Sequence, residues 1–149
     1  MKQLLFGVGA VIAYYAYILP AVSLLNLRKQ RQELTDMTRF LMQALFPGVD
    51  LGRVRLTANA TLPWPKPRRA ITLNRSIYVR DEFDQLRSRD LRLLLHELVH
   101  VDQYRRKGTL NFMWSYGRAL AKAGSYRRNL LEVEAFEFAL RHRGAIGDL

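Results

Sequence analysis

The chain begins with a long apolar stretch. Residues 3–27 carry no charged side chain, with Lys2 before them and Arg28 and Lys29 directly after them. About 20 consecutive apolar residues are enough to cross a bilayer as a helix, so we expect residues 1–28 to form a transmembrane or signal-anchor helix. Two alternatives stay open: a cleaved signal peptide, which would leave a secreted domain, and a hydrophobic helix buried within the protein or a partner.

The next segment has a helical pattern of polar and apolar positions. Residues 29–46 place Asp36, Arg39 and Gln43 on one face and their apolar side chains on the other. The apolar positions are Leu34, Met37, Phe40, Leu41, Ala44 and Leu45. A Pro-Gly pair follows and ends the pattern. We therefore expect an amphipathic helix that packs on the rest of the domain, with a position along the membrane surface as the alternative.

Strand-like segments occupy the middle of the chain. Residues 53–57 alternate between apolar and polar side chains, and residues 70–74 and 76–80 are also strand-like. Prolines between residues 61 and 69 exclude a strand there and predict a loop. These segments predict a short, mainly antiparallel sheet within an α+β fold that is mostly helical.

Helical patterns return in the second half. Residues 88–107 are apolar nearly all round, which predicts a central, buried helix on which the sheet packs. Residues 109–124 end at a glycine, and residues 129–142 carry a wide apolar arc. A chain of 149 residues is long enough for one domain with a core of its own but not for two. We therefore assign residues 29–149 to a single domain.

The predicted central helix carries the motif His-Glu-Leu-Val-His, which is His96, Glu97 and His100 with two residues between. Positions four apart lie on one face of a helix, so the two imidazoles can bind one zinc ion. Glu97 reaches the same side and can act as the catalytic base on a zinc-bound water, whose pKa the metal lowers towards ~7. Three fixed residues also occur by chance, and the alternative is a buried helix with two hydrogen-bonded histidines.

A catalytic zinc site needs a third protein ligand from elsewhere in the chain. The position ten residues after His96 is Arg106, which excludes a third histidine there. Glu132 lies in the middle of the apolar arc of residues 129–142, where an unpaired carboxylate is costly. It is the better candidate, and His142, nearer the edge of the arc, stays the second. The alternative role for Glu132 is a buried salt bridge to an arginine.

The motif, followed by Glu-Val-Glu-Ala at residues 132–135, resembles the gluzincins, zinc metallopeptidases whose third ligand is a glutamate. Two branches are similar. One is the membrane-bound group with the CAAX prenyl proteases and the heat-shock membrane protease. The other is the short eCIS core metallopeptidase-like domain, similar over residues 94–103. The resemblance implies a minigluzincin-like domain in which Glu132 is the third zinc ligand and Glu97 the catalytic residue.

The likeness to the membrane-bound group has two further implications. That group has an Asn-Ala-x-x-x-Pro stretch, here beginning at Asn59 and Ala60, which implies that these two residues bind the substrate along an edge strand. It also has an aspartate four residues after the ligand glutamate, which orients a histidine, and this chain has Phe136 there. The departure favours an alternative function, a catalytically degenerate zinc domain that is a structural or assembly component at the membrane.

Charge and composition narrow the partners. The formal net charge is +11, from 24 basic and 13 acidic residues, which favours anionic partners such as lipid headgroups. The arginines are scattered and no nucleic-acid-binding motif is present, so nucleic acid is disfavoured. With no cysteine, disulfides and thiolate ligands are excluded. We predict a single-pass, membrane-anchored zinc metallopeptidase that hydrolyses a peptide or protein substrate, with Tyr116 and Tyr126 as candidate donors to the tetrahedral intermediate.

Overall fold

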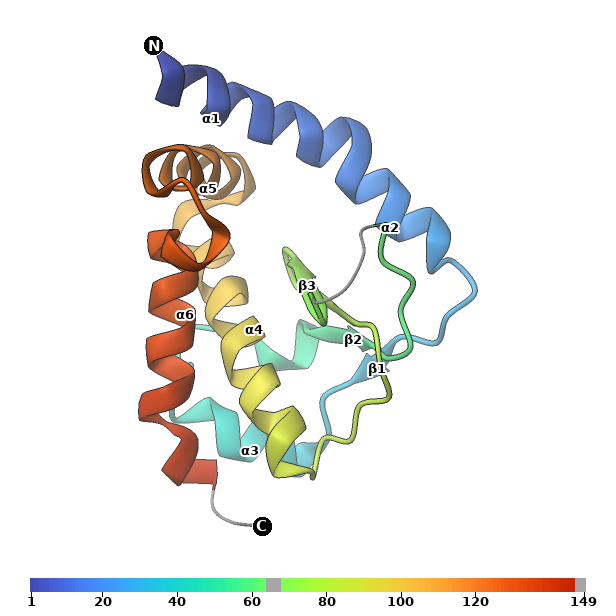
Figure 1. Ribbon diagram of the computed structural model, residues 1–149. Coiled ribbons are helices and arrows are strands. Elements are labelled where there is room, and N and C mark those ends of the chain that lie inside the picture. The colour runs from blue at the N-terminus through green and yellow to red at the C-terminus, as the bar shows by residue number, and fades with distance from the viewer. Residues whose placement is uncertain (64–67, 147–149) are drawn as a thin grey trace.

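An apolar helical arm lies across one end of an α+β domain (Figure 1). The computed structural model describes residues 1–63 and 68–146. The arm consists of α1 (Lys2–Ala13), a π-helical turn (Tyr14–Ile18) and α2 (Leu19–Leu25). Four strands and the helices α3 to α6 form the rest, which confirms the predicted α+β fold class. The predicted loop at residues 61–69 falls partly outside the described residues.

The arm satisfies the requirements of a membrane span by length and composition. Residues Leu4–Leu25 form 22 residues of apolar helix near the N-terminus, although a signal sequence would pass the same test. Tyr14 and Val22 are buried against the domain, whereas most other apolar side chains of the arm are exposed. The division between an anchor at residues 1–28 and a domain after it stays a prediction.

The first half of the arm packs closely on α5 (Thr109–Ala123). A Cβ atom at Gly117 would lie 2.5 Å from the Cβ of Ala10 and 2.6 Å from the backbone oxygen of Phe6. A Cβ atom at Gly7 would lie 2.9 Å from the ring of Trp114. Only glycine allows the two helices this close, so α1 is docked on the domain as well as apolar.

The sheet has the strand order β1-β2-β4-β3. Its strands are β1 (Gln32–Glu33), β2 (Arg55–Thr57), β3 (Ala70–Leu73) and β4 (Ser76–Val79). β1 pairs with β2 and β3 pairs with β4 in antiparallel fashion, but β2 and β4 are parallel. The sheet is therefore mixed, and the prediction of a mainly antiparallel sheet holds for two of its three pairings. β3 lies at one edge.

The amphipathic helix predicted at residues 29–46 is shorter, and its predicted buried face is wrong. The strand β1 takes the first part, and α3 (Asp36–Gln43) begins only after Thr35, whose Oγ1 accepts a hydrogen bond from the backbone N–H of Thr38. Met37 and Phe40 are 58% and 79% exposed. The side chains that α3 buries are Thr38 and Met42.

Two neighbouring, antiparallel helices carry the candidate site. α4 (Ser88–Lys107) is buried along most of its length, as predicted, with Leu91, Leu94 and Leu98 fully enclosed. α6 (Leu130–Arg141) lies beside it, and the sheet lies on the other side of α4 (Figure 1). α5 connects the two helices and ends at Gly124, as predicted. This arrangement brings side chains of α4, α6 and β3 together in the interior.

Candidate metal centre

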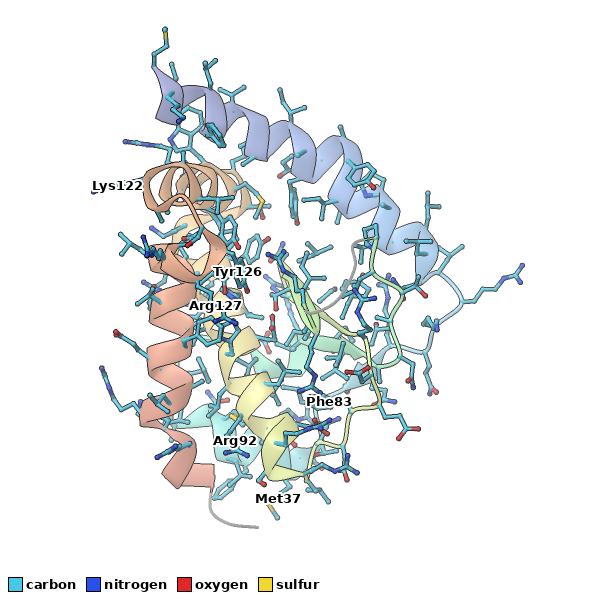
Figure 2. The ribbon with its side chains drawn as sticks, in the orientation of Figure 1. Met37, Phe83, Arg92, Lys122, Tyr126 and Arg127 are labelled. Atoms are coloured by element: carbon cyan, nitrogen blue, oxygen red, sulfur yellow. The ribbon has the colours of Figure 1, made fainter. Side chains whose placement is uncertain are left out.

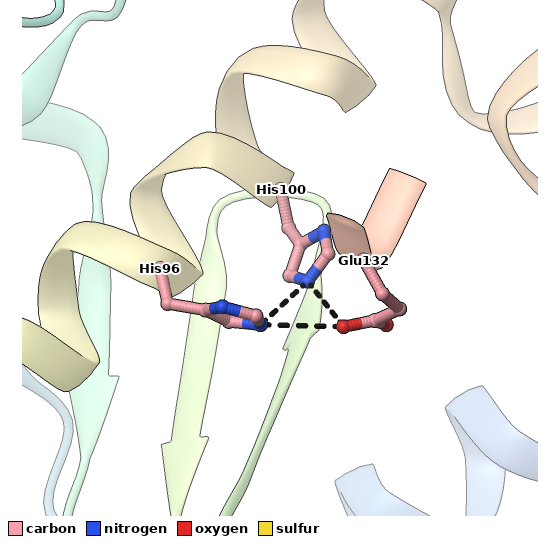
Figure 3. A group of neighbouring side chains, drawn as sticks. All are labelled: His96, His100 and Glu132. Carbon is pink, nitrogen blue, oxygen red and sulfur yellow. Dashed lines mark hydrogen bonds and ion pairs between the residues drawn. The ribbon is translucent and has the colours of Figure 1, made fainter. Parts of the chain in front are cut away.

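Three buried side chains form a triangle of ligand atoms between α4 and α6 (Figure 3). The Nε2 atoms of His96 and His100 are 3.2 Å apart, and Oε2 of Glu132 lies 3.3 and 3.5 Å from them respectively. Metal–ligand distances of about 2.0–2.1 Å in a tetrahedral zinc site place neighbouring ligand atoms about 3.3 Å apart. The triangle therefore has the dimensions of one face of such a site, and the group can hold a metal ion.

Gln103 orients His100. Its Oε1 lies 2.9 Å from Nδ1 of His100, and because an amide oxygen only accepts, Nδ1 carries the proton and Nε2 keeps its lone pair for the triangle. The side-chain nitrogen of Gln103 donates to the backbone oxygen of Leu131 at 3.0 Å and to Glu134 at 2.9 Å. One fully buried amide thus fixes the tautomer of His100 and links α4 to α6.

No residue that the structure describes orients His96 in this way. Its Nδ1 atom is buried and makes no hydrogen bond within the described part of the chain. The ring of Phe136 packs against it instead, with 4.5 Å between the ring centroids. His96 is therefore held by packing on Phe136 and by its contacts with Glu132 and His100.

Glu132 is charged and oriented. Tyr116 donates a hydrogen bond of 2.8 Å to Oε1, which leaves Oε2 facing the two histidines. Burial alone would raise the pKa of this carboxyl, but hydrogen bonds with His100 and His96 lower it, and the net pKa lies well below the usual value. For His100 burial lowers the pKa, the interaction with Glu132 raises it, and the net change is upward.

Glu97 lies beside the triangle and is held by the sheet. The hydroxyl of Thr72, on β3, donates to Oε2 of Glu97 at 2.7 Å, and Glu97 is only 5% exposed. Glu97 lines the same pocket as His100 and Glu132. A carboxylate in this place, with its second oxygen unbonded in the described structure, can accept a proton from a molecule bound at the triangle.

The other predicted site residues lie elsewhere. Asn59 and Ala60 continue β2, and their backbone N–H groups donate to carbonyls at and just after the end of β4. Neither lines the two pockets at the triangle, whereas β3, at the free edge, does. His142 ends α6, packs on Phe138 and is not part of the triangle. The geometry thus favours Glu132 over His142 as third ligand.

Sequence reasoning missed two of the residues that support the site. Gln103 lies three residues after His100, a spacing that puts both side chains on one face of the helix. That signal was available in the sequence. Tyr116 was noted only as a candidate donor to a substrate, because its contact with Glu132 depends on how α5 and α6 pack.

Comparison with known sequences supplies the family. The sequence profile of the eCIS core domain matches residues 33–108, just over half of the chain. This chain belongs to the eCIS core domain family. The eCIS core match contains α4, with both histidines, Glu97 and Gln103, and it confirms the resemblance drawn from residues 94–103. It ends before α5 and α6, so Glu132 lies outside it. No curated protein and no solved structure matches the chain.

Proposed function

We propose that this eCIS core protein is a zinc-dependent peptidase whose metal ligands are His96, His100 and Glu132. The observation that carries the proposal is the triangle of ligand atoms, 3.2 to 3.5 Å on a side, with Glu97 lining the same pocket. Two imidazoles and one carboxylate with a neighbouring acid are the donor set of hydrolytic zinc sites with an open position. When bound, zinc would acidify a water molecule and polarise the peptide carbonyl.

The chain's own residues supply the proton transfers. Glu97 accepts the proton of the attacking water and delivers it to the leaving amine, with Thr72 holding one carboxylate oxygen so that the other faces the reactants. Tyr116 is engaged with Glu132. Tyr126 also interacts with Glu132, but it lines both pockets at the triangle, whereas Tyr116 lines the apolar one alone, so of the two tyrosines Tyr126 is the better candidate to donate to the developing oxyanion.

The family relates the protein to extracellular contractile injection systems. We infer that the peptidase acts within such a system and that the apolar arm anchors it to a membrane. The arm supports this inference through its length, its composition and the exposure of most of its apolar side chains.

The substitution Glu97→Gln tests the enzymatic proposal. It removes the proton acceptor but none of the three ligands, so the variant should keep the metal content of the wild type and lose hydrolysis by at least about a hundredfold. Hydrolysis of a mixed peptide library by the zinc-loaded full chain, read by mass spectrometry, makes the comparison. Equal rates for both proteins would contradict the role of Glu97.

A second function is favoured by one observation: Nδ1 of His96, beside Phe136, has no hydrogen-bond partner in the described part of the chain. A histidine without an orienting hydrogen bond is consistent with a zinc domain that has kept its fold and lost catalysis, and that is a structural component of the injection system or of the membrane. In that case the wild type would bind zinc stoichiometrically and hydrolyse no peptide in the library.

A further inference from the structure

Two cavities of different character meet at the triangle. The first, of ≈ 570 Å³, lies between the arm, α5 and β3. Its walls are mostly apolar, and they include Phe6, Ile71, Leu73, Phe112 and Met113. The arm therefore forms one wall of the cavity that leads to His100 and Glu132, which line it as well.

The second cavity, of ≈ 1190 Å³, opens on the other side of the triangle and is strongly basic. Six arginines line it, namely Arg68, Arg69, Arg89, Arg92, Arg127 and Arg143. Among the described residues that line it, Glu97 is the one acid. Figure 2 shows Tyr126, Arg127 and Arg92 one below the other beside α4 and α6.

Part of this positive charge has no counter-ion among the residues that the structure describes. Arg69 and Arg89 lie within ion-pair distance of Asp90. No described acidic side chain pairs with Arg92, Arg127 or Arg143, and all three are exposed. A guanidinium group binds a carboxylate through two parallel hydrogen bonds, so these arginines can receive acidic groups of a ligand.

The catalytic residues lie at the junction of the two cavities. Glu97 and Tyr126 line both, His96 lines the basic cavity, and His100 and Glu132 line the apolar one. A chain that crosses the triangle therefore has one flank among apolar side chains and the other among arginines.

We propose that the substrate is a peptide with large apolar residues on one side of the scissile bond and acidic residues on the other. This inference rests on the proposed peptidase function for the cleavage itself. The binding preference, however, follows from the two cavities alone. It therefore can be tested without hydrolysis.

The test measures binding to the zinc-loaded full-length Glu97→Gln protein in detergent, by fluorescence anisotropy of labelled peptides. The first peptide joins a leucine- and phenylalanine-rich half to a glutamate-rich half, and it is made in two versions with the halves in opposite order. A second has glutamine for every glutamate, and a third has alanine for every apolar residue. We expect the apolar–acidic peptide, in one of its two orders, to bind at least about tenfold more tightly than the glutamine peptide and the alanine peptide. Its advantage over the glutamine peptide should shrink at high salt.

Variants assign the two halves to the two cavities. Arg92→Gln with Arg127→Gln should remove the preference for glutamate over glutamine. Arg118→Gln with Arg141→Gln, two exposed arginines outside both cavities, should keep it. Gly9→Leu places a side chain in open space at the apolar cavity and should weaken binding of the apolar half roughly tenfold without a clash.

Equal affinity for the glutamate and glutamine peptides would overturn the inference. So would a preference for glutamate that survives Arg92→Gln with Arg127→Gln. Stronger competition by phosphatidylglycerol vesicles or polyuridylate than by unlabelled peptide would overturn it as well. Failure of the peptidase proposal is a separate result. A protein that binds the apolar–acidic peptide but whose wild type hydrolyses no peptide would refute catalysis and leave the binding preference standing.

Discussion

Gln103 shows how a single residue outside the ligand set determines the state of the site. It makes three hydrogen bonds while fully buried, one of which fixes the proton of His100. Glu132 could be predicted from the sequence because a carboxylate in an apolar arc needs a partner. The partners of Gln103 and Tyr116 could not be predicted in this way, since they come from helices whose packing the sequence pattern does not specify.

The substitution Gln103→Leu should weaken zinc binding by about 10- to 100-fold, because His100 loses the partner that sets its tautomer. It should also cost about 1–3 kcal/mol of stability, since the backbone oxygen of Leu131 loses a buried donor. Competition with a fluorescent zinc chelator measures the affinity. Gln43→Leu, at an exposed position, is the matched control. Unchanged affinity in a folded Gln103→Leu protein would refute the orienting role.

The ion pair between Glu132 and His100 predicts opposite pH responses with and without metal. The pKa of Glu132 is lowered on folding, so its contribution to stability is complete above the ordinary glutamate pKa of about 4.3 and is lost progressively as the pH falls below that value. The pKa of His100 is raised, so its contribution is complete below about pH 6.5 and is lost as the pH rises through the folded value. Metal-free protein should therefore become less stable above about pH 6.5.

Bound zinc should reverse this dependence of stability on pH, because the histidine ligands of zinc must be neutral. The midpoint of thermal unfolding should fall with rising pH in chelator-treated protein and rise in zinc-loaded protein. His142→Ala should leave both slopes in place, since His142 lies outside the triangle. Parallel curves for the two forms would contradict the assignment of the ion pair.

At the scale of elements, the pattern of apolar and polar residues predicted a helix or strand correctly where that element packs on the core along one continuous face. The helices at residues 88–107 and 109–123 and the strands β3 and β4 follow the sequence prediction closely. The segment 29–46 did not, because residues 32–33 pair with β2 and Thr35 starts the helix late. Pairing with a strand more than 20 residues away overrides a short amphipathic pattern.

Packing of α1 on α5 provides a prediction at this scale. Gly117→Ala adds a Cβ atom that meets the backbone of Phe6, so the free energy of unfolding should fall by about 1–3 kcal/mol. Gly9→Ala, on α1 of the same helix pair but facing open space, should not lower it. Chemical denaturation of the full chain in detergent makes the comparison. Equal stability of the two variants would mean that α1 does not dock on α5.

The whole molecule combines a region that the family profile covers with elements beyond it. His96, His100 and Glu97 lie within residues 33–108, whereas Glu132 and the arm lie outside. The triangle therefore requires α6 to pack on α4, and the apolar cavity requires the arm to pack on α5. From sequence, the candidate ligands and the apolar stretch could be recognised one by one. Their meeting around one site, and the parallel β2–β4 pairing behind it, depend on the tertiary fold.

The most direct test of the account is the metal content of the purified full chain after zinc reconstitution, measured by plasma mass spectrometry for the wild type and for His96→Ala, Glu132→Ala and His142→Ala. We expect about one zinc per chain in the wild type and in His142→Ala, and almost none in the other two. A wild type without zinc, or zinc that persists in Glu132→Ala and is lost in His142→Ala, would contradict the site described for this protein.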